Sequence, residues 1–74
     1  MARDHHAAAP PPTIEQLEAA AMHLRRNERA VHELAARGRL SNTAIAERLG
    51  IPVHVAERLL ARALRKLDRA LERL

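Results

Sequence analysis

The sequence predicts an all-α fold: a small four-helix domain with a C-terminal helix-turn-helix and a long last helix. Three observations lead to this prediction. Phe, Tyr and Trp are absent, so the core must be built from the aliphatic residues and Met that pack well between helices. From residue 14 onwards, apolar residues recur every three or four positions, which is the period of a helical face. Start and stop signals such as Ser41 and Gly50 divide this pattern into separate helices.

The composition limits the class of protein. A chain of 74 residues forms one small domain, which buries only about 60% of its unfolded surface. There is no Cys, which excludes disulfides and thiolate zinc sites and suits a reducing cytoplasm, where we expect the protein. No apolar run reaches the roughly 18 residues that span a bilayer, so no membrane partner is expected. The net charge is +4, and twelve of the thirteen basic residues are Arg, which favours phosphate and guanine as ligands.

The first helix is expected to follow a leader. Residues 1–12 predict disorder, because small residues and three consecutive prolines offer no apolar face, and the domain should occupy residues 13–74. Thr13 followed by Gln16 fits a capping box, so the helix should begin at Ile14. Its expected buried face is Ile14, Leu17, Ala21 and Leu24.

The second helix should begin at Asn27, a good N-cap, with Glu28 in the first turn facing the positive end of the helix dipole. Gly38 is expected to end it in the left-handed conformation. The apolar stripe of this helix is Ala30, Val31, Leu34 and Ala35.

The third helix is short and has the clearest limits. Ser41 should cap its start, and Gly50 should end it, because glycine enters a sharp turn with positive φ without steric cost. Pro52 suits the first turn of a fourth helix that starts near Val53. Close crossing of two such helices needs a small residue on the first, a glycine in the turn and an apolar residue on the second, and Ala46, Gly50 and Ala56 lie at these positions. The segment therefore predicts a helix-turn-helix.

The last helix has two opposite faces. Nothing breaks it between residues 53 and 74, which gives a length of about 33 Å. One face carries Val53, Ala56, Leu60, Leu64, Leu67, Leu71 and Leu74. The other carries His54, Arg58, Arg62, Arg65, Arg69 and Arg73, flanked by Glu57, Asp68 and Glu72. An arginine stripe of this kind is either a solvated face with i,i+4 ion pairs or a surface for DNA phosphates and bases.

The leucine face also leaves two alternatives. Packing inside the domain should use residues 53–64. The seam of Leu67, Leu71 and Leu74 lies beyond a compact three-helix core, so it either contacts the first helix or pairs two chains as a homodimer.

The run SNTAIAERLGIPVHVAERLLARALRKL, residues 41–67, resembles region 4.2 of bacterial sigma-70 factors, above all the extracytoplasmic-function branch. The preceding LRRNERAVHELAARGRL resembles that family's upstream helix, so the likeness covers about two thirds of the chain. A weaker likeness is to the DNA-binding domain of quorum-sensing-type response regulators. The resemblance implies a domain that reads the −35 promoter element of double-stranded DNA and docks on the flap of the RNA polymerase β subunit.

The resemblance also implies roles for individual residues. The base-facing residues would be Val53, His54, Glu57 and Arg58. The phosphate contacts would be Thr43, Arg62 and Arg65. The chain departs from the family where Pro52 replaces a Ser or Thr cap and Ala56 replaces a larger apolar residue. The 74 residues also lack the region that melts the −10 element, so we expect either a free-standing region-4-like regulator or a fragment of something longer. The Met1 start and the proline-rich leader favour the free-standing regulator.

The rival function is protein binding without DNA, in which the domain mimics sigma region 4 on RNA polymerase or on an anti-sigma-like partner. Glu57 favours this alternative, because a carboxylate near phosphates weakens binding unless it accepts from a cytosine amine. Enzyme activity is not expected, since no nucleophile with a base, phosphate loop or paired carboxylates can be found. The five His residues form no i,i+4 pair and join no carboxylate cluster, so we expect no metal and no cofactor.

Overall fold

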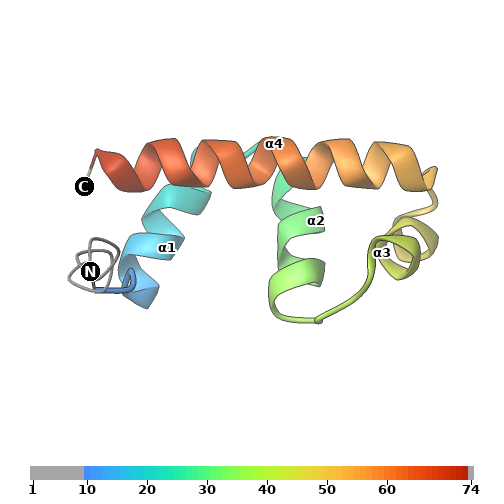
Figure 1. Cartoon of the computed structure of the whole chain (residues 1–74), viewed down its shortest axis with the longest axis horizontal. Helices are drawn as coiled ribbons and strands as arrows, with labels where there is room; N and C mark the ends of the chain where they lie inside the picture. The colour runs from blue at the N-terminus through green and yellow to red at the C-terminus, as the bar shows by residue number, and fades with distance from the viewer. Residues whose placement is uncertain (1–9, 74) are drawn as a thin grey trace, which may run out of the picture.

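The computed structural model describes residues 10–73, and these form four α-helices. Their bounds are α1 Ile14–Ala21, α2 Arg26–Ala36, α3 Asn42–Leu49 and α4 Val53–Glu72. The long α4 lies along one side of the molecule, with α1 beneath its C-terminal half, α2 beneath its middle and α3 beneath its N-terminal end (Figure 1). The predicted all-α, four-helix architecture with a long last helix is confirmed.

The predicted leader lies mostly outside the described residues, which begin at residue 10. Pro10, Pro11 and Pro12 are exposed and have no regular secondary structure. Helix α1 begins where expected, because Thr13 and Gln16 form the capping box. The Gln16 N–H donates to Thr13 Oγ1 at 3.1 Å, and the Thr13 N–H donates to Gln16 Oε1 at 2.9 Å.

The predicted buried face of α1 is wrong at its N-terminal end. Ile14 and Leu17 are 70% and 40% exposed, whereas Ala20 and Leu24 are buried. The reason is geometric: α1 has only eight residues and meets α4 at its C-terminal end, so its first turns extend away from the core (Figure 1).

Helix α2 begins at Arg26 with Arg25 as N-cap, so the predicted N-cap at Asn27 is wrong. Glu28 occupies the third helical position, and its Oε1 accepts the Arg25 N–H at 2.8 Å. A carboxylate at this position satisfies a backbone donor that the helix itself leaves unpaired.

The end of α2 also differs from the prediction, because Arg39 and not Gly38 has the left-handed conformation, with φ 54°. Gly38 is needed for a different reason. A Cβ at Gly38 would lie 2.8 Å from the carbonyl oxygen of Leu34, so the chain passes too close to the helix for any side chain.

The turn between α3 and α4 forms as predicted. Ser41 Oγ accepts the Ala44 N–H at 3.1 Å, and Gly50 has φ 68° at the C-terminus of α3. The Ile51 N–H then donates to the Ala46 carbonyl at 3.0 Å, which closes the helix end. Pro52 is the N-cap of α4, one position before the first turn where we expected it.

The core has two parts, both built on α4. The part that joins α2, α3 and α4 consists of Val31, Ile45, Ala46 and Ala56. The part that joins α1 and α4 consists of Ala20, Leu24, Ala63, Leu67 and Ala70. Helix α4 therefore buries alanines at every seventh position, where a small side chain lets another helix approach closely.

The leucine face of α4 is consequently rotated relative to the prediction. Leu64 and Val53 are 48% and 38% exposed, so residues 53–64 are not all used for internal packing. Leu67 is buried and Leu71 is packed beside it against α1, which is one of the two alternatives that the sequence left open. Leu74 lies outside the described residues, and a homodimer through this seam stays a prediction.

Candidate nucleic-acid interface

Helices α3 and α4 cross at small residues. Ala46 and Ala56 are both buried in the same apolar cluster, and Leu49, Ile51, Leu59 and Leu60 pack around them. Gly50 supplies the sharp turn between the two helices. The three positions that sequence reasoning assigned to the crossing are therefore used as expected, and α3 holds the first turns of α4 at a fixed angle.

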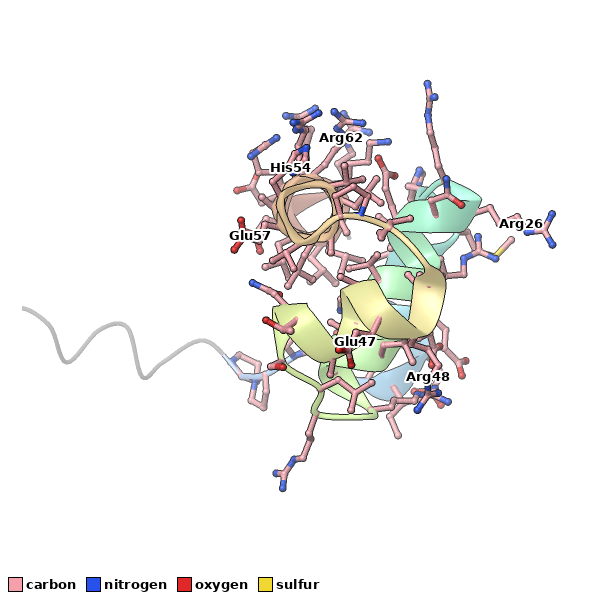
Figure 2. All side chains as sticks on the ribbon, turned by 90° about the vertical axis from the view of Figure 1, so that its right-hand side faces the viewer. Arg26, Glu47, Arg48, His54, Glu57 and Arg62 are labelled. Carbon is pink, nitrogen blue, oxygen red and sulfur yellow. The ribbon has the colours of Figure 1, made fainter. Side chains whose placement is uncertain are left out.

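The structure places all seven predicted DNA-binding residues on the surface. Six of them lie within the first 13 residues of α4, and the seventh, Thr43, lies in the first turn of α3. Viewed along α4, His54 and Arg62 project from the side of the helix that is turned away from α2 and α3 (Figure 2). Glu57 projects from the flank of this surface in the same view. The structure thus exposes all six α4 residues along the N-terminal part of one helix and places Thr43 on a different helix.

The arginines of α4 are not engaged by acidic side chains within residues 10–73. The ion pairs there join Arg37 to Glu33 at 3.5 Å and Lys66 to Glu28 at 2.8 Å. A solvated face stabilised by i,i+4 ion pairs would instead join the stripe to the acids of its own helix. The guanidinium groups of Arg58, Arg62 and Arg65 therefore have no acidic partner within 4.0 Å in that part of the chain.

Sequence reasoning missed the contact that fixes the middle of α4. The Lys66 Nζ donates to both carboxylate oxygens of Glu28, at 2.8 Å and 3.0 Å, and the Glu28 side chain is only 1% exposed. The two residues are 38 positions apart, so no local pattern connects them. The available signal was that Lys66 is the single lysine among thirteen basic residues.

The environment of Glu28 favours its charged form. Burial raises the pKa of the carboxyl group, but the Lys66 hydrogen bonds, the Arg25 N–H and the charges of Lys66 and Arg62 outweigh it. The pKa of Glu28 therefore lies below its ordinary value, and the carboxylate is charged at neutral pH. Every buried side-chain nitrogen and oxygen among the described residues has a hydrogen-bond partner, so this polar contact is complete.

Other kinds of site find no support in residues 10–73. No group of three His, Cys, Asp or Glu side chains in this range could hold a metal ion. The helices of this range also include none with the length and apolar character needed to cross a bilayer. Comparisons with protein-family models, with curated proteins and with solved structures found no match for this chain.

Proposed function

We propose that this domain binds double-stranded DNA in a sequence-specific manner, as a transcription regulator that resembles region 4 of sigma-70 factors. The observation that carries the proposal is the exposed arginine stripe on the second helix of a helix-turn-helix, with no acidic partner among the described residues. Helix α3 braces α4, and the first turns of α4 enter the major groove.

Each residue of the interface then has a defined task. Arg58 donates to the two acceptors of a guanine, and His54 contacts a neighbouring base edge. Glu57 accepts from a cytosine amine, the one base group that favours a carboxylate in the groove. Arg62, Arg65 and Thr43 bind phosphates on either side of the groove and fix the position of the domain without reading sequence.

The surrounding structure supports this geometry because contacts with the other helices hold α4 in place at several points along its length. The α4 alanines belong to two separate apolar clusters, and Lys66 in addition ties the C-terminal half of the helix to α2. Since the helix is held along its length, its backbone needs little ordering when it meets the DNA, which lowers that part of the entropic cost of binding.

The dependence of affinity on salt tests the proposal. Duplexes are selected from a random pool, and the affinity for the selected and a scrambled duplex is measured by fluorescence anisotropy between about 50 and 200 mM salt. We expect log K to fall linearly with log salt, and Arg65→Ala to weaken both duplexes alike and to reduce the slope by about 0.9. Absence of duplex binding at about 50 mM salt would contradict the proposal.

A second candidate function is docking on a protein, such as RNA polymerase or an anti-sigma-like partner, without DNA. It is favoured by the exposed apolar side chains of Ile14 and Leu17, which line a groove between α1 and α2 with Ala21 and Ala36. Capture of RNA polymerase by the domain, lost on Leu17→Glu, together with no affinity for any selected duplex would favour this alternative over DNA reading.

A further inference from the structure

A basic pocket lies at the junction of α1 and α4, away from the predicted reading residues. It has a volume of about 140 Å³ and is lined by His23, Lys66, Arg69, Ala70 and Arg73. None of the lining residues is acidic. His23 comes from the turn after α1 and the others from the C-terminal half of α4, so the pocket requires the packing of these two elements. We call it the distal basic pocket.

We propose that the distal basic pocket binds a backbone phosphate of the duplex, a contact that rests on the proposed function and extends it. The ligand chemistry is a phosphate group. Guanidinium groups bind phosphate with two parallel hydrogen bonds, and Arg69 and Arg73 bring two of them to one pocket. His23 adds a ring N–H donor from the opposite wall.

The charge of the pocket comes mainly from the two arginines. Lys66 also lines it, but its Nζ donates to both oxygens of the buried Glu28, whose negative charge offsets the ammonium. An ammonium has three N–H donors, so one remains for a ligand. Lys66 therefore acts chiefly as a positioning residue, which holds α4 against α2 while Arg69 and Arg73 reach the phosphate.

The position of the pocket along α4 explains why it would bind backbone rather than bases. Fifteen residues separate His54 from Arg69, which at 1.5 Å per residue is about 22 Å along the helix axis. The major groove is only about 12 Å wide, so a pocket this far from the reading turn lies past the edge of the groove that His54 enters. Phosphates on one strand are spaced about 3.4 Å along the duplex axis, so the contact lies at most roughly six base pairs from the base-facing turns of α4.

This placement separates affinity from specificity. A phosphate bound at the distal basic pocket carries no sequence information, so it adds affinity equally for every duplex that is long enough. Duplex length is therefore the variable that isolates the pocket. A short duplex that reaches only the base-facing residues at the start of α4 offers no phosphate to the pocket. A duplex extended by about eight base pairs on the side of the pocket supplies one.

The test uses the full chain and the double variant Arg69→Gln/Arg73→Gln. Both side chains are exposed, so the fold should be retained, which circular dichroism checks. The variant should bind the extended selected duplex about tenfold more weakly at low salt, with a salt slope lower by about 0.9 because one phosphate contact is lost, and the short duplex like the wild type. A control for the loss of charge as such is the single variant Arg48→Gln, which removes one of the charges on the side of the domain away from His54 and Arg62 (Figure 2).

The outcomes distinguish this inference from the proposed function. If Arg58→Ala loses sequence discrimination while the double variant binds both duplexes like the wild type, DNA reading stands and the pocket contact is overturned. If no duplex binds at all, both proposals fail. Inorganic phosphate is the second arm: a saturating shift of the His23 ring signals in NMR, absent from the double variant, is expected. If the wild type shows this shift but the double variant loses no affinity for the duplex, the pocket binds free phosphate and not a phosphate of the duplex, which would overturn the inference.

Discussion

The Nζ of Lys66 lies 2.8 Å from Oε1 of Glu28, and this contact joins the middle of α4 to the first turn of α2. Its position matters for the interface. On α4 the contact lies within the stretch that packs on α1, between Ala63 and Leu67, so it adds a tie to α2 where α4 also holds α1. A buried ion pair adds little net stability over apolar residues of the same size. Removing one partner is nevertheless strongly destabilising, because it leaves the other charge buried and unpaired.

Lys66→Ala should therefore be costly. It leaves the Glu28 carboxylate buried with the Arg25 N–H as its remaining hydrogen-bond partner, and we expect a loss of about 3 to 5 kcal/mol in the free energy of unfolding. Urea denaturation followed by circular dichroism measures this loss. The control is the double variant Glu28→Leu/Lys66→Met, which removes both charges and should recover most of the stability. Wild-type stability in Lys66→Ala would show that the contact does not hold α4.

Stability should depend on pH through Glu28. Its pKa is lower in the folded chain than the ordinary value of 4.5, so at acidic pH the unfolded chain binds more protons than the folded one. The contribution of Glu28 is complete above about 4.5 and is lost as the pH falls through the folded pKa. Urea denaturation of the wild type and Glu28→Gln should give a stability difference that shrinks between about pH 6 and pH 3. A difference that stays constant over this range contradicts the assignment.

Substitutions at the two residues with left-handed backbone, Gly50 and Arg39, should change the stability of the fold in opposite directions. Gly50→Ala introduces a side chain at φ 68° with nothing within 4 Å of its Cβ, so only backbone strain is added and we expect a loss of about 1 kcal/mol. Gly50→Asn should lose less, because Asn tolerates this conformation better. Arg39→Gly should gain stability of roughly 0.5 kcal/mol, because Arg39 has φ 54°. Thermal unfolding of the three variants measures the order of their stabilities. A Gly50→Ala variant more stable than the wild type would contradict this account.

Substitution of two leucines of α4 that are three positions apart should have very different effects on the free energy of unfolding. Leu67 is 5% exposed, and Leu67→Ala leaves a cavity between α1 and α4 that costs about 2 to 5 kcal/mol. Leu64 is largely exposed, so Leu64→Gln should change the unfolding free energy by about 0.5 kcal/mol or less. Equal losses in the two variants would mean that the leucine face points inwards as the sequence alone suggests.

Local signals predicted the parts of this fold that depend on few neighbouring residues. The Thr13 capping box, the Ser41 cap and the Gly50 turn each involve backbone and side chains within a few positions, and each forms as expected. The start of α2 was missed because Glu28 was interpreted by its distance from Asn27, while its hydrogen bonds connect it to Arg25 and to a lysine 38 positions away.

The orientation of α4 was harder to predict, because the leucines dominate its hydrophobic pattern while the buried positions of α4 are Ala56, Ala63 and Ala70 together with Leu67. A pattern of residue sizes on one helix does not show which helices will cross it. For the candidate site, the sequence predicted exposure of the arginine stripe. It did not predict that His23 would close a basic pocket with the end of α4, since that depends on the packing of α1.

The most direct test of DNA reading compares two arginines of equal charge. Arg58 lies on the exposed side of α4, and Arg48 lies on α3, on the far side of the domain from His54 and Arg62 (Figure 2). Affinity for the selected duplex relative to a single-base variant at the expected guanine is measured for Arg58→Ala and Arg48→Ala. We expect Arg58→Ala to lose about 1 to 3 kcal/mol of discrimination and Arg48→Ala to keep it. Unchanged discrimination in Arg58→Ala would contradict a reading role for α4.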